Sequence, residues 1–166
     1  MAGHLWVSWD EYHQHIEQLA LRVHESGYRF DRILCLARGG LRIGDVLSRL
    51  FRTPLDILSV SSYREAAGTE QGELRIADNI TSTAGPLAGR ILLIDDLVDS
   101  GITLERVQAH LSSHFPAVTE VRSAVIWVKA GSRVQPDYFV KYLSDSPWIH
   151  QPFEIYDERC VGELKA

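Results

Sequence analysis

The amino-acid sequence predicts an α/β protein with an open, mainly parallel sheet flanked by helices. Short apolar runs such as RILCLA (32–37) and RILLID (90–95) are almost uninterrupted, which is typical of strands buried on both faces. These runs alternate with segments of helical period, and the connections between them are short. In such sheets ligands bind beyond the carboxyl ends of the strands, and the chain's polar motifs stand at those ends.

The elements follow in order along the chain. The first is a helix over 8–26, which Ser8 or Asp10 can cap. Its apolar face consists of Tyr12, Ile16, Leu19 and Val23. Further strands are expected at 32–37, 55–63, 74–81, 90–95, 120–129 and 138–143, and further helices at 41–51 and 101–115. Residues 64–73 are small and polar without an apolar period, which indicates a mobile loop.

The composition is that of one globular domain. The chain has 166 residues, of which 45% are apolar and 23% charged, enough for a hydrophobic core. No apolar run approaches the ~20 residues that cross a bilayer, and the N-terminus lacks a signal pattern, so we expect a cytoplasmic protein without integral membrane association. The net charge of −5 argues against a nucleic-acid partner. Cys35 and Cys160 do not have the spacing of metal ligands.

The stretch ILLIDDLVDSGIT (91–103) carries the clearest chemical signal. Asp95 and Asp96 follow a buried strand, and adjacent carboxylates stay ionised only beside a cation or hydrogen-bond donors. The next residues form a turn into a helix, whose free amides and dipole favour a phosphate. Hydroxyls from Ser100 and Thr103 add donors, and Gly101 permits a close approach of the backbone. The pattern therefore predicts a sugar-phosphate site, with acids toward the sugar.

Two other interpretations of this stretch remain open from the residues alone. Ser100 could simply cap the helix, with the two aspartates as a solvated strand end. A phosphoacceptor pocket of the receiver type also places acids at strand ends. The hydroxyl and glycine residues that lead at once into a helix favour the sugar-phosphate site.

The stretch resembles the thirteen-residue signature of the type I phosphoribosyltransferases, which bind 5-phosphoribosyl-1-pyrophosphate (PRPP). LARGGLRIG (36–44) is similar to the family's pyrophosphate loop, and SSYREAAGTEQGELRI (61–76) to its mobile loop. VKAGSRVQPDYFV (128–140) and DSPWIHQPFE (145–154) resemble the purine-binding end of the bacterial xanthine-guanine branch. The resemblance implies the type I fold as one domain over 1–166, with a core of about 28–130 and a hood of about 131–160 joined by the N-terminal segment.

The resemblance also implies a role for each matching residue. Asp95 and Asp96 would contact the ribose hydroxyls, and Asp96 would help to place Mg²⁺, directly or through water. Asp99 would take or relay the proton of the base. The remaining assignments are Ser100, Gly101, Ile102 and Thr103 for the 5′-phosphate, Arg38 and Gly39 for pyrophosphate, and Lys129, Trp148 and Ile149 for the purine. The peptide that joins Ala37 to Arg38 is implied to be cis.

The activity that the resemblance implies is purine salvage. PRPP and a 6-oxopurine, which is guanine, xanthine or hypoxanthine, would give the nucleoside monophosphate and pyrophosphate with Mg²⁺ as cofactor. The loop over 64–73 would close over the site from a hinge at Tyr63. The branch commonly has a basic residue where this chain has Gly72, so the use of that loop is not carried over. Family members usually form dimers or tetramers.

Two alternatives to this activity stay open. A regulatory protein of the same fold could keep the site as a PRPP sensor, although the negative charge and the lack of an appended DNA-binding segment weigh against it. A phosphoribosyltransferase for another base is the second alternative. Lys129 does not separate the three 6-oxopurines, because all of them present the same oxygen.

Overall fold

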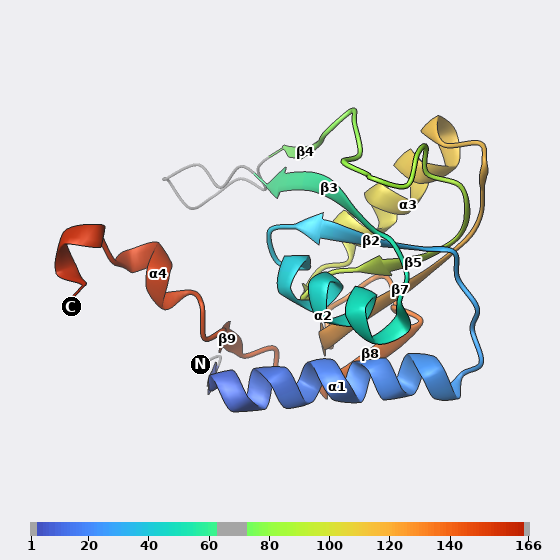
Figure 1. Ribbon diagram of the computed structural model, residues 1–166. Coiled ribbons are helices and arrows are strands. Elements are labelled where there is room, and N and C mark those ends of the chain that lie inside the picture. Colours follow the sequence, from blue (N-terminus) through green and yellow to red (C-terminus); the bar gives the residue numbers. More distant parts are fainter. Residues whose placement is uncertain (1–2, 63–72, 165–166) are drawn as a thin grey trace.

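The computed structural model describes residues 3–62 and 73–164 and shows a sheet with helices on both faces (Figure 1). The main sheet of these residues consists of β2 (Arg32–Ala37), β3 (Leu55–Ser62), β4 (Leu74–Ile76), β5 (Gly89–Ile94), β6 (Leu97–Val98), β7 (Val118–Lys129) and β8 (Tyr138–Leu143). The helices are α1 (Trp9–Glu25), α2 (Leu41–Phe51), α3 (Ile102–His114), the short α4 (Ile155–Glu158) and the 3-10 turn η1 (Val161–Glu163). Among these helices, none combines the length and apolar composition of a membrane-spanning segment.

The sheet is mainly parallel, which confirms the predicted fold class. Its order is β4-β3-β2-β5-β7-β6, with β8 on the other side of β7, and β4 is antiparallel to β3. The prediction of a strand over 74–81 is wrong in length, because β4 ends at Ile76. Beyond it, Thr81 forms a single antiparallel bridge with Ile57 of β3. The intervening Asp78 and Asn79 are exposed and polar, so this stretch has no apolar alternation with which to continue a strand.

Alternate residues of the buried strands face two separate cores. On one face Cys35 of β2 and Ile94 of β5 pack with α1 and α2, whereas on the other face Leu34 and Leu93 pack with α3. Figure 1 shows α1 and α2 on one side of the sheet and α3 on the other. Because successive strand side chains point to opposite faces, a strand covered by helices on both sides must be apolar throughout. That is the reason for the continuous runs RILCLA and RILLI.

The strand that carries the acid pair has a break in it. β5 pairs Ile94 with Ala124 of β7, and β6 pairs Leu97 with Trp127, so the register is unchanged across Asp95 and Asp96. The predicted strand end at Asp95 is therefore wrong in detail: the strand resumes for two residues before the turn at Asp99. Two charged residues interrupt the apolar run, which is why the continuation is not visible in the sequence pattern.

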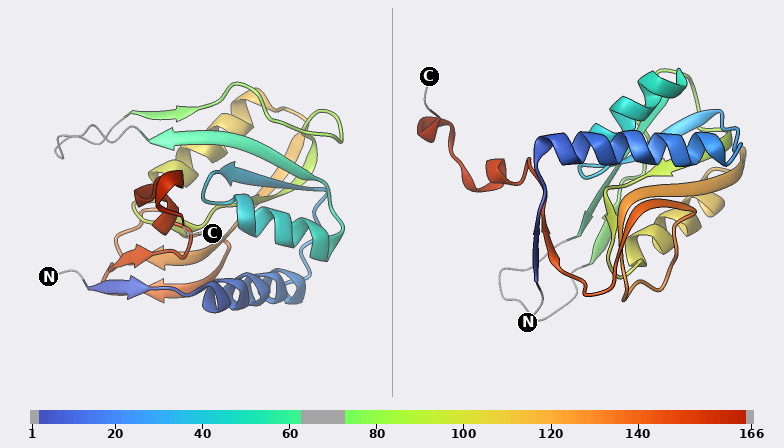
Figure 2. Two further views of the ribbon diagram at one scale, coloured as in Figure 1. Left: turned by 60° about the vertical axis from the view of Figure 1, so that its left-hand side comes forward. Right: turned by 90° about the horizontal axis from the view of Figure 1, so that it is seen from below.

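A second, two-stranded sheet joins the two ends of the chain. β1 (His4–Trp6) runs parallel to β9 (Trp148–His150), as the neighbouring strands in Figure 2 show. Neither strand was predicted, since three residues are too few for a recognisable alternation. The pairing brings the N-terminal segment beside the segment expected to form the hood. The division of the chain into core and hood stays a prediction.

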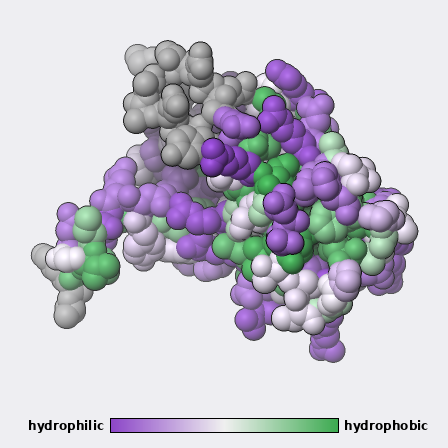
Figure 3. Space-filling view, turned by 90° about the horizontal axis from the view of Figure 1, so that it is seen from above, coloured by the Kyte–Doolittle hydropathy of each residue, from purple (hydrophilic) through white to green (hydrophobic). Residues whose placement is uncertain are grey.

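Beyond Glu154 the chain leaves the body of the molecule (Figure 3). In Figure 3 this C-terminal tail stands out from the rest, and apolar side chains gather near its end. Val161 and Leu164 are both strongly exposed. The expected mobile loop over 64–73, with its hinge at Tyr63 and with Gly72, lies outside the described residues except for Glu73.

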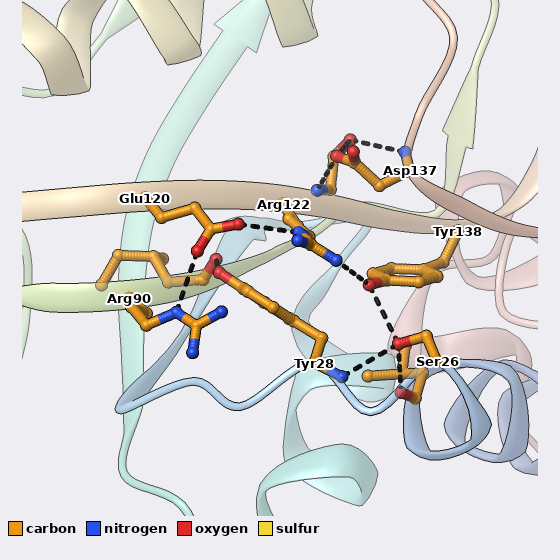
Figure 4. Close-up of polar contacts among 10 residues, drawn as sticks. Ser26, Tyr28, Arg90, Glu120, Arg122, Asp137 and Tyr138 are labelled. Atoms are coloured by element: carbon orange, nitrogen blue, oxygen red, sulfur yellow. Dashed lines mark hydrogen bonds and ion pairs between the residues drawn. The ribbon is translucent and has the colours of Figure 1, made fainter.

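The edge of the sheet opposite the acid pair is held by a polar network (Figure 4). Glu120 of β7 accepts hydrogen bonds from Arg90 at 2.9 Å and from Arg122 at 2.8 Å. Arg122 also donates to the Tyr138 hydroxyl at 3.0 Å and lies over the ring of Tyr28, 4.3 Å from its centroid. The network ties β5, β7 and β8 to the connection that follows α1. It has its partners within the fold, so we assign it to stability.

Candidate active site

A cavity of about 430 Å³ lies where β5, β6 and β7 end. Parallel strands present their carboxyl ends on one edge of a sheet, which is where α/β folds bind ligands. Nine of the residues predicted from the sequence line it: Asp95, Asp96, Asp99, Ser100, Gly101, Thr103, Lys129, Trp148 and Ile149. They come from three separate stretches of the chain that meet only in the folded structure.

The Asp96 carboxylate is held in place from two sides. Its Oδ1 accepts from the amide of Leu97 at 2.8 Å, and its Oδ2 accepts from the side-chain amide of Gln151. The loop after β2 packs directly against it, because a Cβ on Gly39 would lie 2.7 Å from Cγ of Asp96. Any larger residue at position 39 would displace the carboxylate. The predicted pyrophosphate loop and the predicted sugar acids are thus in contact.

The charged form of the Asp95 carboxylate is disfavoured in the folded protein. It is half-buried, and its Oδ1 accepts from the amide of Asp96 at 2.9 Å. Burial, and next the negative charge of Asp96, raise the pKa of Asp95 well above its ordinary value. Among the described residues, the donors around the two carboxylates therefore do not offset the cost of keeping Asp95 charged, as expected of a site that receives further donors or a cation from a ligand.

Asp95→Asn is expected to raise the melting temperature of the ligand-free protein near neutral pH. The folded protein keeps the Asp95 proton at pH values where the unfolded chain has released it, so this group's contribution to stability falls as the pH rises above about 4. The amide removes this loss and keeps an oxygen acceptor for the Asp96 amide. Melting curves at several pH values test this, and a gap between variant and wild type that does not widen with pH would contradict it.

The turn from Asp99 into α3 has the geometry of an anion site. Gly101 adopts φ +84°, and a Cβ there would lie 2.8 Å from Oγ of Ser132, so the turn requires glycine. No side chain caps α3. The Ser100 hydroxyl is 3.4 Å from the amide of Ile102, which is long for a hydrogen bond and argues against a simple capping role. The first turn of α3, with its free amides and the positive end of the helix dipole, thus borders the cavity.

Asp99 and Lys129 form an ion pair in the cavity wall. Lys129 Nζ lies 3.0 Å from Asp99 Oδ2, and the lysine is 8% exposed while the Asp99 side chain is largely open to solvent. Lys129 is the last residue of β7, and its aliphatic stem is buried while its charge reaches the cavity. The predicted proton acceptor and the predicted base-recognising lysine therefore meet on one side of the site.

β9 forms another part of the cavity wall. Trp148 is 49% exposed and lines the cavity, and Ile149, which is buried, lies next to it in the chain. The pairing of Trp148 with His4 and of Ile149 with Leu5 fixes this short strand on β1. An exposed indole at the rim of a cavity provides a flat apolar face on which an aromatic ring can stack.

Three predicted residues lie outside the cavity wall. Arg38 follows the cis peptide that the resemblance implied, but its exposed guanidinium points to the C-terminal tail, 3.5 Å from Asp157. Ile102 begins α3 and does not line the cavity. Gly39 is likewise absent from the wall, although it touches Asp96. The structure thus brings the acids, the phosphate turn and the base side together, with the Arg38 side chain directed elsewhere.

Sequence reasoning missed two polar residues of the cavity wall, Gln151 and Glu154. Both belong to the DSPWIHQPFE stretch, and the position of Gln151 two residues after Ile149 was the available signal. Burial raises the pKa of Glu154, and the charges of Asp96 and Asp157 add to the shift. The site thus contains one more acidic group than the sequence indicated.

A parallel α/β sheet with paired acids beside an uncapped helix N-terminus defines a sugar-phosphate-binding class of protein. The profile of the family described as phosphoribosyl transferase domain matches residues 8–158, and the chain belongs to that family. Similar solved structures include a purine phosphoribosyltransferase from Pyrococcus horikoshii, with 30% identity over 90% of this chain and 93% of that one and a TM-score of 0.74. Its similarity extends over nearly the whole length of both chains.

Two more distant structures share the fold. Xanthine-guanine-hypoxanthine phosphoribosyltransferase from Helicobacter pylori is 24% identical, covering 93% of this chain and 96% of that one, with a TM-score of 0.76. A hypoxanthine phosphoribosyltransferase from Staphylococcus aureus is 20% identical over 80% of this chain and 74% of that one, with a TM-score of 0.60. Phosphoribosyltransferases are glycosyltransferases, so the family membership also indicates the type of group transfer.

Proposed function

We propose that the chain is a purine salvage enzyme that transfers the 5-phosphoribosyl group from PRPP to a 6-oxopurine. The observation that carries this proposal is the Lys129–Asp99 pair at 3.0 Å, which places a donor and a proton acceptor in the same cavity as the acid pair. A site with only the acid pair and the phosphate turn would serve any PRPP-binding protein. In this proposal Lys129 selects the class of the second substrate, a purine with an oxygen at C6.

The sugar phosphate would lie along the DDLVDSGIT stretch. Asp95 and Asp96 would accept hydrogen bonds from the two ribose hydroxyls, which would add donors to this acid pair. The 5′-phosphate would sit on the amides and hydroxyls of residues 99–103 at the start of α3. Arg38 and the loop at Gly39 would hold the pyrophosphate, and for this the Arg38 side chain must leave the weak, exposed contact with Asp157.

The base would lie between Lys129 and Trp148. Lys129 would donate to the oxygen at C6 of the purine, Trp148 would stack on the ring, and the backbone of Ile149 would face the 2-position. Adenine has an amino group at C6, which is itself a donor, so the lysine disfavours it. Guanine, xanthine and hypoxanthine share the oxygen, and we propose all three as acceptors.

The acid pair is suited to a magnesium ion. Mg²⁺ prefers carboxylate oxygens, usually binds one or two of them, and completes its shell with phosphates and water. Within residues 3–62 and 73–164 no three acidic, histidine or cysteine side chains are arranged to hold a metal, so PRPP and water would supply most of the ligands. Asp96 would hold the ion directly or through water. When bound, Mg²⁺ would stabilise the negative charge of the departing pyrophosphate.

The reaction is a displacement at C1 of the ribose. The bond from C1 to the pyrophosphate oxygen breaks, positive charge develops on the sugar ring, and a ring nitrogen of the base attacks C1. Asp95 and Asp96 would lie beside this developing positive charge and would stabilise it. Asp99 would accept the proton that the base loses, which makes it the general base.

Nucleotide formation tests the proposal. The purified protein is incubated with PRPP, Mg²⁺ and one of guanine, xanthine, hypoxanthine or adenine, and the products are separated by chromatography. We expect a nucleoside monophosphate and pyrophosphate from the 6-oxopurines and little from adenine. Relative rates on the three 6-oxopurines would identify the preferred base. Absence of turnover with all of them would refute the proposal.

The same experiment separates the alternatives. A PRPP sensor of this fold would bind PRPP in calorimetry without any turnover, and a pyrimidine-specific enzyme would form nucleotide only when pyrimidines are supplied. We propose further that the protein acts in the cytoplasm as a dimer or tetramer without a nucleic-acid partner, which sedimentation and gel-shift measurements can check.

A further inference from the structure

Gln151 connects the base side of the cavity to the acid pair. It directly follows β9, the strand that carries Trp148 and Ile149, and its side chain is 4% exposed. Its Nε2 donates to Oδ2 of Asp96, although 55 residues separate the two in the sequence. The hydrogen bond therefore spans from the wall expected to hold the base to the acid expected to hold the sugar.

The oxygen of the same side-chain amide has no hydrogen-bond donor among the described residues. Oε1 of Gln151 is buried and has no hydrogen-bond partner among the described residues, and Gln151 lines the cavity. Buried polar atoms in folded proteins are almost always hydrogen-bonded, because leaving an acceptor dry and unpaired costs free energy. An unsatisfied acceptor in a cavity wall indicates a donor that a ligand supplies.

The position of Gln151 is held independently of its contact with Asp96. The carbonyl of the preceding His150 accepts from the amide of Val7 at 3.1 Å, which continues the β1–β9 pairing, and the Gln151 carbonyl accepts from the amide of Glu154 at 3.0 Å. Its backbone is therefore anchored on both sides. A side chain on such an anchored backbone can orient its partner.

The orientation of the Asp96 carboxylate depends in turn on Gln151. The Asp96 backbone is tied to β7 through the amide of Ile126 at 2.9 Å, and Oδ1 is held by Leu97. Within the described residues, Gln151 is the hydrogen-bond donor to Oδ2. Without that donor the carboxylate could turn about its side-chain bond. Rotation would take Oδ2 away from the place where the sugar and the cation are proposed to bind.

We infer that Gln151 is a positioning residue: its Nε2 fixes the Asp96 carboxylate, and its Oε1 accepts a hydrogen bond from a hydroxyl group of the bound pentose. This inference rests on the proposed function. The amide suits the place because it offers one donor and one acceptor without charge. A carboxylate at position 151 would instead be a further negative charge beside Asp96 and Glu154.

Three substitutions at this position test the inference, with PRPP affinity measured by calorimetry in the presence of Mg²⁺. Q151L removes both polar contacts, Q151N withdraws the amide by one carbon, and Q151E replaces the donor by an acid. We expect Q151L and Q151N to raise the Kd of PRPP about tenfold, as for the loss of a hydrogen bond to a charged group. Q151E should weaken binding further, and the KM of the purine should stay within twofold in Q151N.

The matched control is Q14L, because Gln14 is an exposed glutamine on α1 that does not line the cavity. Its Kd for PRPP should equal that of the wild type. Melting curves identify any variant at position 151 that does not fold, and Q151N, which keeps the polar character, serves if Q151L fails.

A double-mutant cycle with D96N separates positioning from packing. If Gln151 acts partly through Asp96, the combined loss of PRPP affinity in D96N/Q151L should be at least threefold smaller than the product of the two single losses. Independent, multiplicative effects would overturn the positioning role, as would PRPP affinities of Q151L and Q151N within twofold of the wild type. A wild-type protein without PRPP binding or turnover would instead refute the proposed function, so the two failures are distinguishable.

Discussion

Asp99→Ala is expected to lower kcat by about 10²-fold or more while the Kd of PRPP changes by less than about threefold. Loss of a general base slows the chemical step by removing the acceptor for the proton of the purine. The sugar phosphate depends on other groups, namely the acid pair and the main-chain amides of the turn. Steady-state kinetics with saturating PRPP, together with calorimetry, measure the two quantities separately.

The conservative variant Asp99→Asn distinguishes proton transfer from a supporting role. Asp99 also forms the ion pair with Lys129, so the alanine variant changes the lysine's surroundings as well. An amide oxygen can still accept from Lys129 but is a very weak base. If Asp99 accepts the proton, Asp99→Asn loses nearly as much kcat as Asp99→Ala. Recovery of most of the activity in the amide variant would show that orientation of Lys129 is its main task.

Asp56→Ala is expected to reduce the free energy of unfolding by roughly 3–5 kcal/mol. Asp56 is completely buried on β3 and holds Arg32 of β2 through two hydrogen bonds, at 2.9 Å from Nε and 2.6 Å from Nη2. The same guanidinium donates to the carbonyls of residues 84, 85 and 86, each at 3.2 Å. Removal of the carboxylate leaves a buried cation without its counter-charge.

Asp45→Ala provides the matched comparison for this prediction. Asp45 pairs with Arg49 one turn along α2 at 3.0 Å, but both side chains are more than half exposed. Exposed pairs of this kind contribute about 0.3–0.5 kcal/mol. The loss of unfolding free energy, measured by urea denaturation, should therefore be several-fold larger in Asp56→Ala than in Asp45→Ala. Equal and small losses would mean that Arg32 finds water or another acceptor when Asp56 is absent.

Most of the fold was predictable because local pattern and burial agree. RILCLA and RILLI are apolar throughout since helices cover both faces of their strands, and α1 shows its buried stripe at helical spacing. Ser8 rather than Asp10 caps α1: its hydroxyl accepts from the amide of Glu11 at 3.2 Å, and Glu11 accepts in return. Apart from the overlong strand expected over 74–81, the failures are short elements: β1, β6, β9, α4 and η1 have two to four residues each, too few to display a period.

The candidate site was predictable to the extent that it is continuous in the chain. Asp95 to Thr103 supply acids, turn and helix start within nine residues, and the chemistry of such a stretch can be read without knowing its neighbours. Lys129 and Trp148 were assigned only through the resemblance. The contact of Gln151 with Asp96 and the acid Glu154 were not predicted, since no local pattern distinguishes a glutamine that reaches an acid 55 residues away from one that faces solvent.

Residue order alone determined the α/β class, the buried strands and the run of acids, hydroxyls and glycine that suits a sugar phosphate, because hydrophobic periodicity and turn chemistry act between near neighbours. Strand order decided the rest. Placing β7 beside β5 brings Lys129 to 3.0 Å from Asp99, and pairing β9 with β1 carries Gln151 onto Asp96. Such contacts depend on which distant segments pack together, and that choice is made by the burial of the whole core.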